Sequence, residues 1–323
     1  MTLNPRIAFA GTPANAARTL EALVAGGFEV GVVITREDAP VGRKQVLTAS
    51  PVAEVAARFG IPVIKANRID EGAIAELAKH GCSLGVVVAY GALLKHPALD
   101  ALSSGWFNLH YSLLPKWRGA SPVQAALAAG DRETGVTLFR LDEGMDTGGI
   151  VGTVETLINP HENAGELLAR LTELGITLLL EQLPLIQAGL ATERTQTEGA
   201  THCGKLSRAI ARIDWSRSAI EIENGINAYN PEPGAWTTLL GDQVKVLAAR
   251  ALGATDWAAL SESATAGEAP AESGSVSITK SGALVHCGSG TLLELREIQP
   301  AGKKPMPASD WARGIAGREV RFE

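Results

Sequence analysis

Residues 6–13 read Arg-Ile-Ala-Phe-Ala-Gly-Thr-Pro, a short apolar run that ends in a turn. A helical pattern follows at 14–25 and stops at two glycines, and a second apolar run occupies 30–35. A strand, a helix and a second strand in this order are typical of the start of a parallel α/β sheet. We therefore expect the N-terminal part of the chain to fold around such a sheet.

The same alternation of helix and strand continues to residue 185. Helical patterns occupy residues 51–59, 73–80, 121–129 and 164–185. Strand-like runs occupy residues 61–64, 84–89, 106–110, 135–141 and 150–157. The run at 84–89 is almost entirely apolar, as expected for a central strand that is buried on both faces. Residues 36–50 are polar and contain proline and glycine, so we expect a long loop there. These patterns predict a parallel-sheet domain at residues 1–189.

The composition changes near Gly189, where polar residues rich in Thr and Glu begin. We expect a linker at 190–206 and a second domain at 207–323. The tail has one helical pattern, at 218–229. Short strand-like segments follow at 235–239, 244–250, 275–279, 284–286 and 292–298. Turn residues separate these segments, which predicts a small β-barrel or sandwich. The Ala-, Ser- and Glu-rich residues 254–274 are expected to form a flexible loop.

The overall composition is that of a globular protein. Of the 323 residues, 46% are hydrophobic and 20% are charged, so a core can form, and no apolar run is long enough to span a bilayer. Cys82, Cys203 and Cys287 lie far apart, which argues against a disulfide framework and a zinc site, and we expect no bound metal. No signal peptide is evident, so the cytoplasm is the expected location. A net charge of −6 gives the chain as a whole no attraction to nucleic acid.

Three polar residues could carry chemistry at the edge of the predicted sheet. His110 is the histidine at the C-terminal end of a predicted central strand, which is where ligands bind in open α/β sheets. Asn108 lies two residues earlier, so both side chains leave the same face of the strand. Asp146 lies in a glycine-rich loop after the next strand and can reach the same crevice if the two strands are neighbours.

This trio suits the transfer of an acyl group to an amine. Attack of an amine on a formyl carbon produces a tetrahedral intermediate, and Asn108 and a protonated His110 can each donate a hydrogen bond to its oxyanion. Asp146 can hold an ordered water, favour the protonated imidazole and help to relay a proton from the attacking amine to the leaving nitrogen. The same residues could instead serve only the core and a turn, so the trio alone does not decide the function.

Two common enzyme classes are disfavoured by missing motifs. The turn at 11–13 lacks the further glycines of the dinucleotide-binding pattern, which argues against a nicotinamide-dependent dehydrogenase. Ser112 does not lie in a Gly-x-Ser-x-Gly turn, which argues against an α/β hydrolase. Cys82 and Cys287 are expected to be small core residues and not nucleophiles.

The sequence of residues 108–122, Asn-Leu-His-Tyr-Ser-Leu-Leu-Pro-Lys-Trp-Arg-Gly-Ala-Ser-Pro, strongly resembles the signature of the folate-dependent formyltransferases. Similar family segments occur at 135–137 and 142–148, at 87–91 beside the expected folate pocket, and at 9–13 in the opening strand. The tail resembles the branch of the family that formylates methionyl-tRNA, at 205–207, 213–215, 230–236 and 299–306. The resemblance therefore covers nearly the whole chain.

The resemblance implies a Rossmann-like parallel-sheet catalytic domain followed by an OB-like β-barrel domain that helps to hold tRNA. It implies transfer of a formyl group from 10-formyltetrahydrofolate to the α-amino group of methionine on initiator methionyl-tRNA, with Asn108, His110 and Asp146 in the catalytic roles. The residues implied in folate binding are Tyr90, Gly91, Ser112, Leu113, Leu114, Pro115, Leu141, Asp142 and Glu143. Apolar walls and backbone hydrogen bonds suit a flat, uncharged pterin. We expect a monomer.

Residues 36–50 resemble the loop that reaches the acceptor stem of the tRNA in this family. The basic residues expected to contact tRNA are Arg36, Arg43, Lys44, Arg208, Arg212, Lys245, Lys303 and Lys304. The tail at 207–323 has 12 Lys and Arg against 14 Asp and Glu, a net charge of −2, which is unexpected for a domain that binds RNA phosphates. Its positive charge must then be concentrated on one face.

Three alternatives stay open. A formyltransferase could act on a small amine such as glycinamide ribonucleotide, although residues 11–13 contain only one glycine for a phosphate site. An enzyme could hydrolyse 10-formyltetrahydrofolate with water in place of the amine, but the tail would then have no evident purpose. A non-catalytic RNA-binding protein would use the tail and leave the Asn, His and Asp residues idle.

Overall fold

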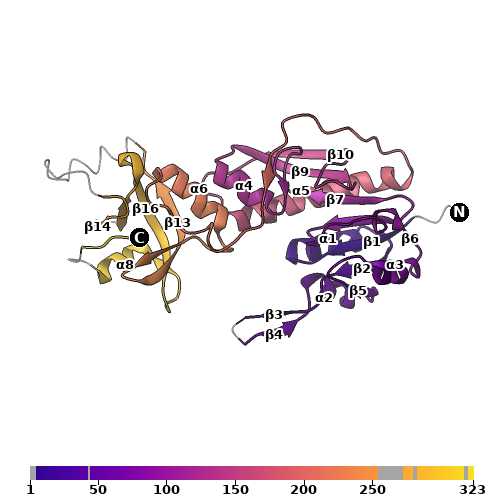
Figure 1. Cartoon of the computed structure of the whole chain (residues 1–323), viewed down its shortest axis with the longest axis horizontal. Coiled ribbons are helices and arrows are strands. Elements are labelled where there is room, and N and C mark those ends of the chain that lie inside the picture. The colour runs from indigo at the N-terminus through magenta and orange to yellow at the C-terminus, as the bar shows by residue number, and fades with distance from the viewer. Residues whose placement is uncertain (1–4, 43, 254–271, 279–281, 316–318) are drawn as a thin grey trace. The chain divides into compact units, whose positions relative to one another are not determined.

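The computed structural model describes residues 5–42, 44–253, 272–278, 282–315 and 319–323 (Figure 1). The chain divides into two compact units, of which the first comprises Met1–Pro122, Glu133–Leu157 and Leu168–Gly204, and the second Val123–Arg132, Ile158–Leu167 and Lys205–Glu323. The limits between the units thus fall at several points of the chain, and the predicted domain limits at 189 and 207 stay predictions. Most of the predicted flexible loop at 254–274 lies outside the described residues.

The first unit is built on a seven-stranded sheet with the strand order β10-β9-β7-β6-β1-β2-β5. Its strands are β1 (Arg6–Gly11), β2 (Val30–Thr35), β5 (Val63–Lys65), β6 (Cys82–Val88), β7 (Trp106–His110), β9 (Glu133–Arg140) and β10 (Ile150–Leu157). The strands from β7 to β5 run parallel, as predicted, whereas β9 runs antiparallel to β7 and to β10. The Rossmann-like architecture is confirmed, with a mixed sheet in place of a wholly parallel one.

Two helices of the first unit begin at a side-chain cap. The helices of this part of the chain are α1 (Ala14–Ala25), α2 (Pro51–Arg58), α3 (Glu71–Ala78), the short η1 (Leu99–Ala101), α4 (Pro122–Ala129) and α5 (Ala164–Gln187), of which α4 and α5 contribute to both units. The Ser50 hydroxyl accepts from the first turn of α2, and Asp70 does the same for α3, which fixes both starts. The predicted helices are confirmed to within a few residues.

The core of the first unit follows the alternation of apolar side chains along the strands. Ala8 and Val32 face the side of the sheet that is covered by Leu77 of α3. On α5, a side-chain carbon at Gly175 would lie 2.7 Å from a methyl carbon of Leu109, so the glycine lets the helix approach β7 closely. The helix α5 therefore packs directly against β7, the strand that carries His110.

Residues 36–50 were expected to form an irregular loop, and this expectation was wrong in part. β3 (Ala39–Val41) and β4 (Val46–Thr48) pair in an antiparallel hairpin, which Figure 1 shows standing away from the sheet. The side chains of Val41, Val46 and Leu47 are more than half exposed, at 56%, 58% and 67%. The hairpin therefore contributes little to the core and presents apolar surface to solvent.

The second unit is a curled antiparallel half-barrel, which confirms the predicted OB-like tail. Its elements are α6 (Ala219–Tyr229), β12 (Trp236–Leu239), β13 (Asp242–Ala251), β14 (Val276–Ile278), β15 (Ala283–His286), η2 (Gly288–Gly290), β16 (Leu292–Pro300), β17 (Met306–Pro307) and α8 (Ala308–Gly314). The strand order is β12-β13-β16-β15-β14, with β17 paired to β16. The Phe322 ring stacks between Trp215 and Trp311 in the core, with ring centroids 5.3 and 5.7 Å away.

Over the residues that the structure describes, none of the helices combines the length and the hydropathy needed to cross a bilayer.

Candidate active site

His110 and Asn108 lie at the end of β7, as the sequence predicts. His110 is 5% exposed, and Asn108 is half-buried. The Asn108 amide has no hydrogen-bond partner among the described residues, so its N–H groups are available to a ligand. Both residues point to one face of the sheet because they are two apart on a strand.

The imidazole of His110 has a different neighbour on each nitrogen. Nε2 lies 2.9 Å from the carbonyl oxygen of Trp117. A carbonyl only accepts hydrogen bonds, so Nε2 carries a proton and donates it to this bond. Nδ1 lies 3.9 Å from Oδ2 of Asp146, which is too long for a direct hydrogen bond but close enough for the two groups to interact as charges.

The surroundings of His110 favour the neutral imidazole. Burial lowers its pKa from the ordinary value of 6.5, while the Asp146 carboxylate and the hydrogen bond to Trp117 oppose this effect. Desolvation penalises the charged form, and here it outweighs both opposing contributions. Near neutral pH the side chain thus has a proton on Nε2 and a lone pair on Nδ1.

Asp146 reaches His110 by an unexpected route. Because β9 is antiparallel to β7, the loop after it leaves the sheet beside Trp106, where the backbone N–H of Leu141 donates to the Trp106 carbonyl at 2.8 Å. This is the start of β7 and not its end, so the loop must fold back to bring the carboxylate to His110. Asp146 adopts the left-handed conformation, with φ of +56°, and its Oδ2 accepts a hydrogen bond of 2.7 Å from the backbone N–H of Gly119.

Residues 201–203, within the predicted linker at 190–206, lie against the loop that contains Trp117. β11 (His202–Cys203) pairs with β8 (Arg118–Gly119), and the Gln196 side chain bonds to the backbone at Asp146. These contacts were not predicted from the sequence. The available signal was weak, because a polar, Thr-rich stretch has no periodicity that reveals its partner.

The predicted folate segment after β7 is partly internal. Ser112 and Leu114 are buried, and the Ser112 hydroxyl donates to the carbonyl of Lys116 at 2.5 Å. Leu113 and Pro115 are half-buried. A ligand would therefore meet the side chains of Leu113 and Pro115 more readily than those of Ser112 and Leu114.

Tyr90 and Gly91 form a braced turn after β6. The Tyr90 side chain is buried, its hydroxyl donates to the carbonyl of Ala66 at 2.6 Å, and burial raises its pKa to about 12. Thr12 donates to the Tyr90 carbonyl at 3.0 Å, and Arg36 donates to the Gly91 carbonyl at 3.2 Å. Gly91 is exposed, with φ of +90°, so the turn offers backbone to a ligand while the Tyr90 ring supports it from inside.

The third predicted folate segment is the start of the loop after β9. Leu141 is half-buried, and Asp142 accepts a hydrogen bond of 2.6 Å from Thr147 within the same loop. Glu143 forms an exposed ion pair of 2.5 Å with His96, whose pKa is raised by Asp100 and Glu143. Asp142 and Glu143 thus have partners that order the loop.

The predicted tRNA-contacting residues fall into one group on each unit. On the first unit, Lys44 is exposed on the hairpin, Arg36 is engaged with Gly91, and Arg43 lies outside the described residues. On the second unit, the guanidinium carbons of Arg208 and Arg212 lie 5.3 and 5.6 Å from the centroid of the Trp236 ring.

Lys245 pairs with Trp236 across β12 and β13, whereas Lys303 and Lys304 are exposed in the turn before β17. The tail therefore has a basic cluster around one tryptophan, which consists of Arg208, Arg212 and Lys245. This cluster concentrates positive charge on a tail whose net charge is −2, and its contact with tRNA phosphates stays a prediction.

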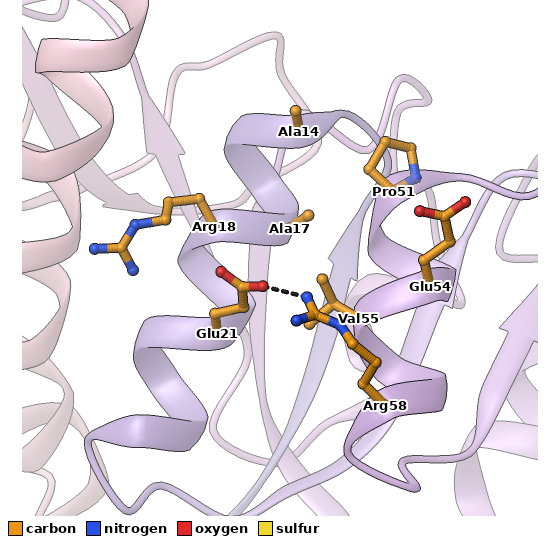
Figure 2. A pocket seen from close by; sticks show the side chains of 8 residues that line it. All are labelled: Ala14, Ala17, Arg18, Glu21, Pro51, Glu54, Val55 and Arg58. Atoms are coloured by element: carbon orange, nitrogen blue, oxygen red, sulfur yellow. Dashed lines mark hydrogen bonds and ion pairs between the residues drawn. The ribbon is translucent and has the colours of Figure 1, made fainter.

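A separate pocket of about 390 Å³ lies between α1 and α2 (Figure 2). Its lining includes Arg18, Glu54 and an ion pair between Glu21 and Arg58, but none of the predicted catalytic or folate-binding residues. In the described part of the chain, no group of three or more His, Cys, Asp and Glu side chains is arranged to hold a metal ion.

Comparison with known families identifies the class of this protein. A family model described as "Formyl transferase" matches residues 5–183, and one described as "Formyl transferase, C-terminal domain" matches residues 205–316. The first match covers more than half of the 323 residues. The chain belongs to the formyl transferase family and is an enzyme of that family, which confirms the resemblance.

Close relatives carry a more specific name. A protein from Paenarthrobacter aurescens (strain TC1) named methionyl-tRNA formyltransferase is 45% identical over 319 residues, which is 98% of this chain and 100% of the relative. A methionyl-tRNA formyltransferase from Arthrobacter sp. (strain FB24) is 46% identical over 320 residues, again 98% and 100% of the two chains.

Solved structures share the fold at low identity. An N-formyltransferase from Helicobacter canadensis, in complex with folinic acid and dTDP-3-aminofucose, has a TM-score of 0.67 at 19% identity and covers 92% of this chain and 99% of that one. Glycinamide ribonucleotide transformylase 1 from Symbiobacterium toebii has a TM-score of 0.51 at 20% identity and covers 59% and 93%.

Proposed function

We propose that this enzyme transfers the formyl group of 10-formyltetrahydrofolate to the α-amino group of methionine on initiator methionyl-tRNA, in the cytoplasm and as a monomer. The observation that carries the proposal is the 45% identity to a methionyl-tRNA formyltransferase over 98% of this chain and 100% of that relative. Identity at this level extends over the tail as well as the catalytic domain.

In this reaction, the α-amino nitrogen attacks the formyl carbon and forms a new C–N bond. The carbonyl oxygen becomes an oxyanion, and Asn108 donates a hydrogen bond to it from an amide that has no other partner among the described residues. A preorganised donor of this kind typically contributes roughly 3–4 kcal/mol to the stabilisation of the transition state. The intermediate then collapses, the bond to N10 of the folate breaks, and the formyl group stays on methionine.

One proton must move from the attacking amine to N10 of the leaving folate. His110 is suited to take it, because its neutral form has a lone pair on Nδ1 and its Nε2 is already bonded to Trp117. The imidazolium that forms lies 3.9 Å from the Asp146 carboxylate, which stabilises its charge until the proton passes to N10. Asp146 can also hold a water that relays the proton.

The folate that donates the formyl group and the tRNA that accepts it are assigned to different surfaces. The exposed Gly91 turn, the half-buried Leu113 and Pro115, and Leu141 offer backbone and apolar contacts to a pterin. The hairpin with Lys44, and separately the cluster of Arg208, Arg212 and Lys245, offer positive charge to tRNA phosphates.

A product assay tests the proposal. The purified protein is incubated with 10-formyltetrahydrofolate and methionyl-tRNA, the aminoacyl ester is hydrolysed, and N-formylmethionine is measured by mass spectrometry. Parallel reactions contain glycinamide ribonucleotide or no acceptor. We expect N-formylmethionine in the reaction with methionyl-tRNA and no formylated product or formate in the other two reactions. Turnover with glycinamide ribonucleotide alone, release of formate without acceptor, or tRNA binding without turnover would each replace the proposal by one of its alternatives.

A further inference from the structure

We propose that Gln196 is a positioning residue for Asp146, and that residues 194–203 form a strap that holds the catalytic loops in their working geometry. The inference rests on the proposed function of Asp146 and His110. It concerns a segment that lies outside the strands and helices that carry these two residues.

Gln196 uses both ends of its amide to connect two loops. Its Nε2 donates to the carbonyl of Asp146 at 2.8 Å and to the carbonyl of Gly148 at 2.9 Å. Its Oε1 accepts from Nη2 of Arg118 at 2.7 Å and from Nε at 3.1 Å. The loop that carries the carboxylate and the loop that carries Arg118 are thereby joined through one side chain.

The strap also supports the partner of His110. The hydroxyl of Thr201 accepts from the backbone N–H of Trp117 at 2.8 Å, and the carbonyl of Thr201 accepts from the backbone N–H of Arg118 at 2.9 Å. At Gly119, a side-chain carbon would lie 2.1 Å from the carbonyl oxygen of Cys203, so strap and loop are in backbone contact. The strap therefore holds the backbone on both sides of the Trp117 carbonyl, which accepts the hydrogen bond from His110.

The conformations held by the strap are ones that the chain does not adopt readily. Trp117 has φ of +59° and Asp146 has φ of +56°, both in the left-handed region. Each costs an ordinary residue roughly 1–2 kcal/mol, so surrounding contacts must maintain it. Asp146 also approaches from the start of β7, and no strand dictates where its carboxylate lies. The backbone N–H of Gly119 holds the carboxylate itself, and the hydrogen bonds of Gln196 to the carbonyls of Asp146 and Gly148 hold the backbone that carries it.

The burial pattern separates this role from a general contribution to folding. Between residues 192 and 200, Gln196 alone is half-buried, and the others are exposed. The strap therefore buries little apolar surface. Water can replace the lost hydrogen bonds in a Gln196 variant, so the protein should fold while Asp146 relaxes away from His110.

The test compares Gln196→Ala and Gln196→Glu with Thr197→Ala, whose side chain has no hydrogen bond in the described part of the chain. Gln196→Glu keeps acceptors for Arg118 but has no N–H for the two carbonyls. We expect both Gln196 variants to lower kcat by roughly 10- to 100-fold with little change in KM for tRNA, because a small misplacement of a catalytic group has effects of this size. Thr197→Ala should behave as wild type.

The second readout needs no substrate. The His110 imidazole is titrated by NMR in histidine-labelled protein, and in both Gln196 variants its pKa should fall towards the value in Asp146→Asn, because the carboxylate no longer supports the charged form. Unchanged kcat, or reduced kcat with an unchanged His110 titration, would overturn the inference. If wild-type protein forms no formylmethionine, the proposed function fails, and the titration alone still decides whether Gln196 positions Asp146.

Discussion

Nε2 of His110 donates a hydrogen bond of 2.9 Å to the carbonyl oxygen of Trp117, a residue held in the left-handed conformation. This bond fixes the tautomer of the imidazole. It leaves Nδ1, the nitrogen that faces Asp146, as the atom able to accept a proton. The predictions on His110 and Asp146 follow from this assignment.

Replacement of His110 by Ala should lower turnover by roughly 10²-fold or more, because the reaction loses the group that moves the proton. The measurement is the rate of formylmethionine formation at saturating substrates, with circular dichroism to verify folding. His80→Gln is the matched control, since His80 lies just after α3 and away from β7. Near-normal turnover in the His110 variant would refute its role.

The pH dependence should have an acidic limb set by His110. The neutral imidazole is the active form, so kcat/KM should be retained above its pKa, which burial places below 6.5, and should fall as the pH drops through that pKa. Asp146→Asn removes a charge that raises the pKa, so the midpoint of this limb should move to lower pH while the maximal rate also drops. A midpoint that moves upward would contradict the arrangement. Rates are measured from pH 5 to pH 8 at constant ionic strength.

Asn108→Ala should lower kcat by roughly 10²- to 10³-fold, the usual cost of one oxyanion-hole donor. KM for the folate should change little, because the hydrogen bond strengthens mainly in the transition state. Asn108→Asp retains the shape but presents a negative charge to the oxyanion, so it should be no more active than the Ala variant. If a variant loses folate affinity but keeps kcat, Asn108 contributes to binding of the folate and not to stabilisation of the transition state.

The double variant Arg43→Ala with Lys44→Ala should raise KM for tRNA and weaken its dependence on salt, because fewer phosphates are neutralised. Folate affinity should be unaffected. Lys79→Ala, which removes one exposed lysine beyond α3, is compared with Lys44→Ala alone as the control for a change of one unit in net charge. Reduced folate affinity in the double variant would show that residues 36–50 belong to the donor site.

Phe322→Ala should destabilise the second unit by about 3–5 kcal/mol, since it removes a buried ring that stacks between Trp215 and Trp311. Urea unfolding followed by tryptophan fluorescence reports this directly, because two tryptophans line the cavity. Leu240→Ala, at a side chain that is 86% exposed, should leave the transition unchanged. Equal midpoints for the two variants would mean that the ring stack contributes nothing.

Regular elements of this protein could be predicted from the sequence because their apolar patterns are strong. β7 and β10 have the predicted limits, Trp106–His110 and Ile150–Leu157. Strand direction could not be predicted, since an apolar strand looks the same whichever way it runs, and β9 proved antiparallel. The hairpin at β3 and β4 was missed because its strands are three residues long and exposed.

The candidate site was predictable only where a motif marks it. Asn108, His110 and Asp146 stand in recognisable signatures, and the structure brings His110 and Asp146 together. Gln196 and Thr201 carry no local signal, because hydrogen bonds from an irregular segment to a distant backbone leave no periodic trace in the sequence. The groups that hold His110 and Asp146 in place could therefore be found only from the three-dimensional structure.

The exposed course of residues 192–200 has a consequence for how the enzyme fails under mild stress. Segments with little buried apolar surface open at lower free energy than the buried strands of a sheet. Loss of activity in dilute urea should thus precede any change in tryptophan fluorescence or helical content. A protein with native fluorescence and helical content would then be inactive because one short polar segment has detached. Removal of the urea should restore its activity at once.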